Sequence, residues 1–523
     1  MTVFLPPSSL KTKAVGVEFV NEIIDHDKIT SQIQAFLDRP HGHFIDGQWV
    51  DGNSGKTIDV ISPATANVIS SIQSGDGDDV DRAVAAARRA FDSGVWSKAL
   101  PVERARIMFK LADLIELHAS QISQLEALDI GVSRHMMETI GVKLSANQLR
   151  YYAGWVTKIN GETITNSRPR PEGREFLTYT EKEPVGVVGQ IIPWNFPFAM
   201  AVQKIAPALA AGCTIVMKPA EDAPLSTLYL ADLIAQTGLP SGVFNLVNGY
   251  GRKAGAAIAA HGGVDKVSFT GSTDVGKEII RSATGNLKRT TLELGGKSPV
   301  ILLKDADLDE AIPAVARAIF FLSGQNCMAG SRLLVHSDLY DRVLEGLVTL
   351  AKSMTIGADM SGTYDIGPLI SEKQLTRVLA YIDIGISEGA RLITGGKRVE
   401  KLPGFFVEPT IFADCEPDMR IVKEEIFGPV LTVQKFNSDD LDDIAALAND
   451  NIFGLSASIW TADLAQGHKL ARKVKSGQVG INIHAAIDPA TPFGGYKQSG
   501  WGREFGREGL EPYLETKAIT AYL

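Results

Sequence analysis

The sequence predicts an α/β protein in which parallel β-sheets are covered by helices on both faces. From residue 185 to residue 284, short apolar runs alternate with helical segments, which is typical of a parallel sheet. Each of these runs ends in a turn rich in glycine or proline, where open α/β sheets bind their ligands. A second section of the same kind begins near residue 298, so the chain is predicted to hold more than one α/β unit.

The size and composition of the chain indicate a multidomain globular protein. A chain of 523 residues is too long for one hydrophobic core, which predicts two or three domains. Apolar residues make up 45% and charged residues 22%, as in an ordinary soluble globular protein. The net charge of −9 argues against a surface that binds nucleic acid.

Cysteine and histidine usage predicts the compartment and the metal content. Three cysteines do not make a disulfide framework, and their odd number favours a reducing compartment, so we expect a cytoplasmic protein. The first 20 residues lack the unbroken apolar core of a signal peptide. The most apolar window, 187–217, is interrupted by glutamine, lysine and proline, so we expect buried core and no membrane span. The nine histidines show no ligand spacing, so no metal is expected.

The first third of the chain is predicted to be mainly helical. A loose arm should lead into a helix over 30–37, and 43–51 should form a hairpin with Asp46 and Gly47 at its turn. Turn residues at 62–65 should join two short strands. Apolar residues at helical spacing predict helices over 78–91, 102–119, 120–129 and 136–156, and alternation predicts a strand over 175–183.

Strands and helices then alternate. In the first α/β section we expect strands at 185–192, 214–218, 243–247 and 266–270, and helices at 204–211, 226–237, 253–261 and 275–284. In the second we expect strands at 299–303, 331–336, 391–395, 407–411 and 430–436, with a helix at 307–321 opened by Asp305 or Asp307. A glycine-rich tail at 493–509 should lead into a last strand at 517–523.

Two short segments predict covalent catalysis by a thiol. Leu-Glu-Leu-Gly-Gly-Lys at 292–297 offers the Glu293 carboxylate, and Gly-Gln-Asn-Cys-Met-Ala-Gly-Ser-Arg at 324–332 offers the Cys327 thiol. A thiolate forms covalent intermediates readily, and a carboxylate can activate the water that releases them. Cys213 lies in an apolar run and Cys415 between two acidic residues, which makes Cys327 the best nucleophile. For each segment alone, a purely structural role remains the alternative.

Two glycine loops and Glu221 predict a nucleotide site, and Asn195 predicts a donor to an oxyanion. The loop at 269–276 follows a strand and opens a helix, where free N–H groups favour a pyrophosphate, and a second glycine loop lies at 249–255. Glu221, at the end of a strand, would accept both hydroxyls of an adenosine ribose, which favours NAD over its 2′-phosphorylated form. Asn195, in Pro-Trp-Asn-Phe-Pro, is a good donor to a developing oxyanion. The alternatives are plain turn glycines, a helix N-terminal acid, and an asparagine bonded to local backbone.

Together these residues resemble the NAD(P)-dependent aldehyde dehydrogenase superfamily. The likeness runs from about residue 40 to the C-terminus and includes 193–197, 218–221, 269–272, 292–297, the Cys327 segment, 425–429 and 492–495. It implies the aldehyde dehydrogenase fold, with a Rossmann-like NAD-binding domain from 1–155 and 184–295 and an α/β catalytic domain from 296–498. A small β oligomerisation element would combine 156–183 with 499–523. The resemblance also implies a homo-oligomer, either a dimer or a tetramer.

The resemblance assigns catalytic roles position by position. Cys327 would attack the aldehyde, and the oxyanion of the thiohemiacetal would be held by the Asn195 amide and the backbone N–H of Cys327. Hydride transfer to NAD would leave a thioester, which water activated by Glu293 would hydrolyse. Lys204 and Glu515 match a pair of residues that relays protons.

The resemblance also assigns residues to the cofactor. Lys218 and Glu221 would hold the adenosine ribose, and Glu425 the nicotinamide ribose. Ser272 would meet the pyrophosphate, and Phe427 would lie at the nicotinamide end. Further cofactor-binding positions are expected at Ile191, Ile192, Pro193, Trp194, Gly251, Phe269, Gly271, Val275 and Leu294.

The substrate pocket is expected to be mostly apolar. By the resemblance it is lined by Phe196, Met200, Gln203, Asn326, Met328, Ile487 and Phe493. This set lacks the arginine that a carboxylate-bearing aldehyde would need. Residues 36–42 and 484–488 resemble the phenylacetaldehyde dehydrogenase branch, with another aromatic or an aliphatic aldehyde as the alternative. A CoA-acylating member, an NADP-linked member and a non-catalytic structural protein of the same fold are disfavoured because Cys327, Glu293 and Glu221 are all present.

Overall fold

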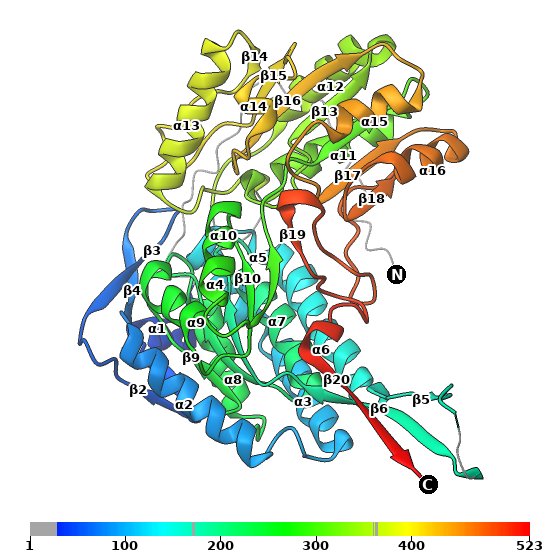
Figure 1. Ribbon diagram of the computed structural model, residues 1–523. Coiled ribbons are helices and arrows are strands. Elements are labelled where there is room, and N and C mark those ends of the chain that lie inside the picture. Colours follow the sequence, from blue (N-terminus) through cyan, green and yellow to red (C-terminus); the bar gives the residue numbers. More distant parts are fainter. Residues whose placement is uncertain (1–28, 170–172, 359, 361–363) are drawn as a thin grey trace.

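The computed structural model describes residues 29–169, 173–358, 360 and 364–523. These residues form two α/β units, one above the other in Figure 1, and a β arm that projects from the lower unit. Each α/β unit is built on its own sheet, as the alternation of apolar runs and helices predicts. The loose arm predicted at the N-terminus lies, over residues 1–28, outside the described residues.

The lower unit is built on an eight-stranded sheet with the order β19-β11-β10-β7-β8-β9-β1-β2. Its five central strands are parallel, whereas β1, β2 and β19 pair antiparallel at the two sides. The strands are β1 (His43–Ile45), β2 (Gln48–Val50), β7 (Val187–Ile191), β8 (Thr214–Lys218), β9 (Phe244–Leu246), β10 (Lys266–Thr270), β11 (Arg289–Glu293) and β19 (Gly500–Trp501). A separate two-stranded ribbon joins β3 (Thr57–Ile61) to β4 (Val68–Gln73).

Helices cover this sheet, and most of them begin and end close to the predicted residues. They are α1 (Ser31–Asp38), α2 (Gly77–Ser93), α3 (Pro101–Leu117), α4 (Ala119–Ile130), α5 (Arg134–Met136), α6 (Val142–Trp155), α7 (Pro197–Ala211), α8 (Leu225–Ala235), α9 (Ala256–Ala260) and α10 (Thr273–Ala283). A π-helical turn, η2 (Met137–Gly141), interrupts the continuous helix predicted over 136–156, and a second, η5 (Gly251–Gly255), precedes α9. No helix in the described part of the chain has the length and apolar character needed to cross a membrane.

The upper unit is built on a seven-stranded sheet with the order β14-β15-β16-β13-β12-β17-β18, parallel except for β14. Its strands are β12 (Pro299–Leu302), β13 (Arg332–His336), β14 (Arg391–Thr394), β15 (Thr410–Ala413), β16 (Val430–Phe436), β17 (Ser456–Trp460) and β18 (Gln478–Ile481). Its helices are α11 (Leu308–Phe320), α12 (Tyr340–Ser353), α13 (Glu372–Ser387), α14 (Arg420–Lys423), α15 (Leu441–Asn449) and α16 (Leu464–Lys473). Asp307 caps α11 by accepting from the Asp309 N–H, which decides between the two predicted caps.

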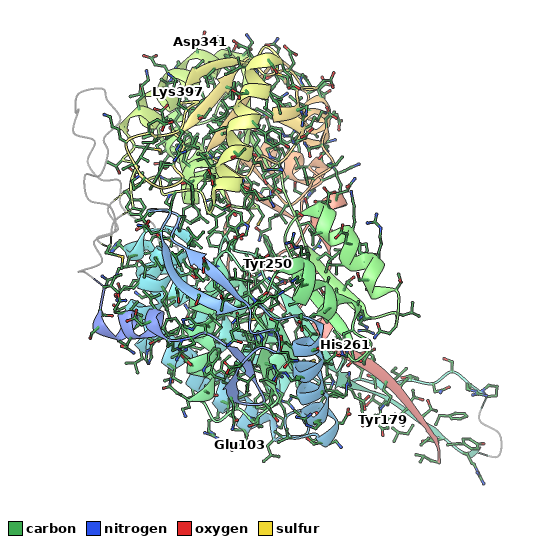
Figure 2. All side chains as sticks on the ribbon, turned by 90° about the vertical axis from the view of Figure 1, so that its left-hand side faces the viewer. Glu103, Tyr179, Tyr250, His261, Asp341 and Lys397 are labelled. Carbon is green, nitrogen blue, oxygen red and sulfur yellow. The ribbon has the colours of Figure 1, made fainter. Side chains whose placement is uncertain are left out.

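The arm is a three-stranded antiparallel sheet with the order β20-β6-β5. It combines β5 (Thr163–Ile164), β6 (Phe176–Pro184) and the C-terminal β20 (Leu514–Tyr522), so it joins segments far apart in the sequence. Figure 2 shows Tyr179 on this arm, away from the two α/β units. Short 3-10 turns complete the chain at η3 (Val156–Lys158), η6 (Phe321–Gly324), η7 (Ser337–Leu339), η8 (Lys497–Ser499) and η9 (Glu511–Tyr513).

Several elements differ from the prediction, and in the upper unit the strands β17 and β18 and the helices α12, α13, α15 and α16 were not predicted. Helix α7 begins at Pro197, where the predicted helix began at residue 204, because proline suits the first position of a helix. The strand predicted over 407–411 lies over Thr410–Ala413. Strand β11 was not predicted, since its sequence Arg-Thr-Thr-Leu-Glu is largely polar, yet it is paired on both sides inside the sheet.

Candidate active site

The two predicted catalytic segments meet where the lower unit faces the upper one. Glu293 is the last residue of β11, at the carboxyl edge of the first sheet, and Cys327 lies between η6 and β13 of the second unit. Gly296 brings the segments into contact, because a Cβ atom at this position would collide with the Cys327 carbonyl. The close approach of the two backbones therefore requires the glycine.

The Cys327 thiol is half-buried. Its Sγ lies 3.9 Å from Oδ1 of Asn326, which also accepts the Met328 N–H at 3.1 Å. Burial raises the pKa of the Cys327 thiol well above its usual range, and the carboxylates of Glu425 and Glu293 raise it further. The thiol therefore needs a base or a nearby positive charge before it can act as a nucleophile.

Asn195 is buried next to the cysteine segment. It follows β7, and its Nδ2 donates to the Gln325 carbonyl at 3.0 Å, two residues before Cys327. This partner is distant in sequence, so the bond differs from the local backbone contact considered as the alternative. A primary amide carries two N–H donors, and the second remains available to an oxyanion at the thiol.

The Glu293 carboxylate is buried and makes no hydrogen bond within the described residues. A Cβ atom on Gly494 would lie 2.9 Å from its Oε1, so the glycine-rich tail passes directly over it. Burial raises the pKa of Glu293 well above 4.5, the charge of Glu504 raises it further, and Lys204 and Arg503 oppose these effects. A carboxyl group with free oxygens and a raised pKa is suited to take a proton from water.

The structure corrects the predicted partner of Lys204. The Lys204 Nζ lies 2.5 Å from Glu504, and both side chains are buried. Glu515 instead pairs at 2.5 Å with Arg289, and both of these side chains are about half-exposed. The prediction for Glu515 is wrong because β20 begins at Leu514, which places residue 515 on the arm. Gln203, predicted to line the substrate pocket, is buried, and its amide donates to Glu504.

We expect Glu504→Gln to lower kcat by roughly 10-fold or more, toward the lower end of what proton-transfer groups contribute. The variant removes the buried charge that pairs with Lys204 while keeping the shape of the side chain. Glu515→Gln is the matched control and should leave kcat close to wild type, because its exposed pair is remote from Lys204. Steady-state kinetics of both variants checks this, and a larger loss in Glu515→Gln would contradict it.

The predicted adenosine-ribose residues lie together at the end of β8. The Lys218 Nζ donates to Glu221 Oε2 and to the Pro219 carbonyl, both at 2.7 Å. The Gly251 N–H, at the start of η5, donates to both Glu221 oxygens at 3.1 and 3.2 Å. Burial raises the pKa of Glu221, but the Lys218 charge and these hydrogen bonds outweigh it, so the pKa lies below its usual value. Glu221 is therefore an ionised acceptor at the carboxyl edge of the sheet.

The remaining cofactor-binding predictions fall around the same edge. Ser272 caps α10 by accepting the Val275 N–H at 3.4 Å, and both residues are exposed. Ile191, Ile192, Phe269 and Leu294 are buried at the strand ends, and Gly271 follows β10.

The other end of the predicted cofactor site contains Glu425 and two aromatic rings. Glu425 accepts the Gly296 N–H at 2.9 Å, and burial raises its pKa to about 7. The rings of Trp194 and Phe427 meet edge to face with centroids 5.3 Å apart. Trp194, which follows Pro193 after β7, and Phe427, from the upper unit, thus contact each other across the junction of the two units.

Apolar side chains surround Cys327. The cluster on which Cys327 packs is formed by Met328, Leu455, Phe493 and Phe505, with Ala485 and Ile487 beside them. Phe196 stacks on Phe321 with centroids 6.1 Å apart, whereas Met200 packs against the main core. Leu455, Phe505, Ala485 and Phe321 were missed by sequence reasoning, since they lie outside the motifs, and the sequence carries no signal for them.

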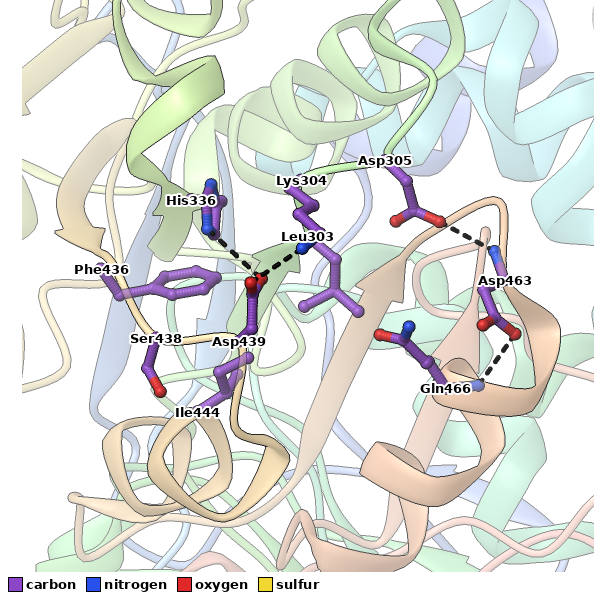
Figure 3. Close-up of a pocket in the computed structure, with 10 residues that line it drawn as sticks. All are labelled: Leu303, Lys304, Asp305, His336, Phe436, Ser438, Asp439, Ile444, Asp463 and Gln466. Carbon is purple, nitrogen blue, oxygen red and sulfur yellow. Dashed lines mark hydrogen bonds and ion pairs between the residues drawn. The ribbon is translucent and has the colours of Figure 1, made fainter.

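A cavity of about 160 Å³ lies at the carboxyl edge of the second sheet. Figure 3 shows its lining residues: Leu303, Lys304, Asp305, His336, Phe436, Ser438, Asp439, Ile444, Asp463 and Gln466. Asp439 bonds the Lys304 Nζ at 2.8 Å and lies 3.7 Å from the His336 Nε2. His336 ends β13, whereas Cys327 precedes that strand, so this cavity is distinct from the candidate active site.

The carboxyl edge of a nucleotide-type sheet faces a second α/β unit that carries the candidate thiol, an arrangement expected of a nucleotide-dependent dehydrogenase. Residues 49–519 match the aldehyde dehydrogenase family. The chain belongs to this family, which confirms the predicted fold and the predicted NAD-dependent oxidation of an aldehyde.

Relatives of known name extend along nearly the whole chain. The phenylacetaldehyde dehydrogenase of Pseudomonas fluorescens is 45% identical over 482 residues, which cover 92% of this chain and 95% of the relative. The betaine aldehyde dehydrogenase of Bacillus subtilis is 45% identical over 483 residues, covering 91% and 96%. The solved NAD⁺ complex of an aldehyde dehydrogenase from Bacillus cereus is 47% identical and superimposes with a TM-score of 0.92, covering 95% of this chain and 99% of that one.

Proposed function

We propose that this protein oxidises phenylacetaldehyde, or a similar aromatic aldehyde, to the carboxylic acid with NAD. The observation that carries the choice of substrate is the apolar surround of Cys327, in which Met328, Ile487 and Phe493 contact the thiol segment. The stacked rings of Phe196 and Phe321 add a second aromatic surface. Such walls favour an aromatic ring over a charged or strongly polar aldehyde. The 45% identity with a phenylacetaldehyde dehydrogenase agrees with this choice.

The proposed reaction passes through two covalent states on Cys327. The Cys327 thiol gives its proton to Glu293, which passes it to the Lys204–Glu504 pair, and the sulfur adds to the aldehyde carbon. The free Asn195 N–H and the Cys327 backbone N–H hold the oxyanion. NAD, when bound, accepts the hydride that leaves this carbon. Glu293 then takes a proton from water, which attacks the thioester, so that the C–S bond breaks and the acid departs. Glu504 and Lys204 pass the proton onward.

The residues at the end of β8 fit NAD. The ionised Glu221 offers two oxygens to the paired hydroxyls of a ribose, and the adjacent Lys218 Nζ donates to the same carboxylate. A 2′-phosphate would bring a second negative charge against this carboxylate, which disfavours its binding. We therefore propose a preference for NAD over NADP.

Assembly and compartment complete the proposal. The arm of β5, β6 and β20 projects from the body, and β20 is an edge strand whose outer side is free to pair with another sheet within the described residues. We propose that it contacts a second copy in a dimer or tetramer.

All three cysteines are free, which suits the reducing cytoplasm.

A substrate panel tests the proposal. NADH formation is followed by absorbance with phenylacetaldehyde, benzaldehyde, hexanal, acetaldehyde and succinic semialdehyde, each with NAD and with NADP. We expect the highest kcat/KM for phenylacetaldehyde with NAD. A preference for hexanal would keep the chemistry and overturn the aromatic assignment. No turnover by protein that still binds NAD would instead support a non-catalytic role.

A further inference from the structure

A row of buried polar side chains crosses the first sheet behind the active site. In the strand register Ser268 of β10 lies between Gln190 of β7 and Thr291 of β11. All three are at most 2% exposed. Lys266 precedes Ser268 by two residues, so its side chain lies on the same face of β10. Four polar side chains thus gather on one face of a core sheet, where uncompensated polar groups are costly.

Lys266 is a second buried lysine in this region. It is fully buried, its Nζ donates to the Thr291 Oγ1 at 2.5 Å, and it lies 5.0 Å from the centre of the Tyr513 ring. No carboxylate in the described part of the chain comes within ion-pair distance of this Nζ. A buried ammonium without a direct counterion is expensive, and the mechanism above gives it no role.

The row also contacts the proton-transfer pair through Ser268. The Ser268 Oγ accepts from the Lys204 Nζ at 3.1 Å and donates to Glu504 Oε1 at 3.3 Å. Glu504 therefore lies close to two lysines, one bonded to it and one beside the bridging serine. The titratable and charged groups around Lys266 are Lys204 of α7, Glu504 of the glycine-rich tail, Arg289 of β11, Cys213 before β8 and Tyr513 of η9.

We propose that Lys266 is a positioning residue whose positive charge, on the same face of β10 as Ser268, supports the buried Lys204–Glu504 pair that receives the proton taken from water by Glu293. The proposal rests on the proposed function and deepens it. The proton moves from water to Glu293 and then to Glu504, while Lys266 keeps its own protons and acts only through its field. Its effect therefore concerns thioester hydrolysis and leaves hydride transfer unchanged.

The charge of Lys266 changes within the working range of pH. Burial, together with the nearby charge of Lys204, lowers the pKa of Lys266 from 10.5 to about 7, although Glu504 acts in the opposite direction. Below this pH Lys266 is charged and adds a second positive charge near Glu504. Above it Lys266 is neutral, and Lys204 alone faces the carboxylate. Removing Lys266 should therefore matter on the acid side of neutrality and not on the alkaline side.

Lys266→Met is the test, since methionine fills a similar volume and replacing a buried charge by an apolar group is often tolerated. Acyl-enzyme formed from phenylacetaldehyde and NAD, or from the aldehyde that the panel selects, is quenched at set times and counted by intact-protein mass spectrometry from pH 5.5 to 9. We expect hydrolysis of the acyl-enzyme to be about 3- to 10-fold slower than wild type below pH 7. A change of this size corresponds to a shift of up to about one unit in the apparent pKa of the pH–rate profile. Above pH 8 the two proteins should agree.

Lys288→Met is the matched control. Lys288 is also buried at the start of the same sheet region, but its Nζ donates to the Ala259 carbonyl, outside the polar row. It should keep the wild-type pH profile. The proposal would be overturned if Lys266→Met hydrolysed its acyl-enzyme at the wild-type rate below pH 7. It would also be overturned if Lys266→Met and Lys288→Met changed the pH profile of hydrolysis equally. If Lys266→Met does not fold, Lys266→Gln replaces it with the same expectation.

Failure of the proposed function would be seen separately. In that case the wild-type protein would form no acyl-enzyme at any pH, or would form it with Cys327 replaced. Failure of the inference alone would leave acyl-enzyme formation intact and would show only that its hydrolysis does not depend on Lys266.

Discussion

Cys327→Ala should abolish aldehyde oxidation while leaving NAD binding nearly intact. We expect kcat/KM to fall by about 10⁴-fold or more, since removal of a covalent nucleophile costs enzymes of this kind several orders of magnitude. The thiol lies beside Asn326 and follows the Gln325 carbonyl that holds the Asn195 amide. Lys218 and Glu221, which we propose to bind the adenosine ribose, bond to each other, to Pro219 and to Gly251. NADH formation measures the first effect, and titration with NAD the second.

Cys415→Ala is the control for Cys327→Ala. Cys415 is buried in an apolar cluster of the second unit, so its loss should lower the free energy of unfolding by about 1 kcal/mol without changing kcat. If Cys327→Ala kept most of its activity while Cys415→Ala lost it, the assignment of the nucleophile would be wrong. If both kept activity, the thioester mechanism itself would be wrong.

The two sheets were predictable because most buried parallel strands are continuous apolar runs. Strands such as β7 and β8 are buried along their whole length, and their sequences show it. Strand β11 escapes this rule because its sequence is largely polar and its Thr291 belongs to the buried polar row beside Ser268. One of the strands that sequence reasoning missed thus contributes to the proposed proton-transfer region.

The candidate site was predictable where chemistry is local in sequence. A thiol among small residues and a carboxylate before two glycines identify Cys327 and Glu293 without knowledge of the fold. The partner of Lys204 depends instead on where the chain turns from β19 into the arm. Because Glu504 and Glu515 both lie in the tail, only the path of the backbone places one in the core and the other on the surface.

The acidic groups around Cys327 impose one requirement on the mechanism. Glu293 and Glu425 both raise the pKa of the thiol, and burial raises the pKa of each carboxyl group in turn. The pocket thus disfavours several negative charges at once. In the proposed mechanism the proton taken from water is therefore passed onward, and the buried Lys204–Glu504 pair is its proposed acceptor.

Glu293→Gln should slow thioester hydrolysis by about 10²- to 10⁴-fold, the usual contribution of a general base. Hydride transfer precedes this step, so a rapid burst of NADH equal to the enzyme concentration should remain and steady-state turnover should fall. The acyl group should accumulate on Cys327 and appear as added mass in the intact protein. Glutamine preserves the size of the buried side chain, so the fold should be retained.

The pH dependence separates a general base from a merely structural carboxyl group. Because the pKa of Glu293 is raised by burial, its ionised fraction, and with it the hydrolysis rate of the wild-type acyl-enzyme, should increase as the pH rises above the usual range for glutamate. In Glu293→Gln this increase should be lost. Glu424→Gln, which removes an exposed carboxylate paired with Arg420, should keep the wild-type profile. An unchanged pH profile in Glu293→Gln, without accumulation of acyl-enzyme, would assign the base to another group.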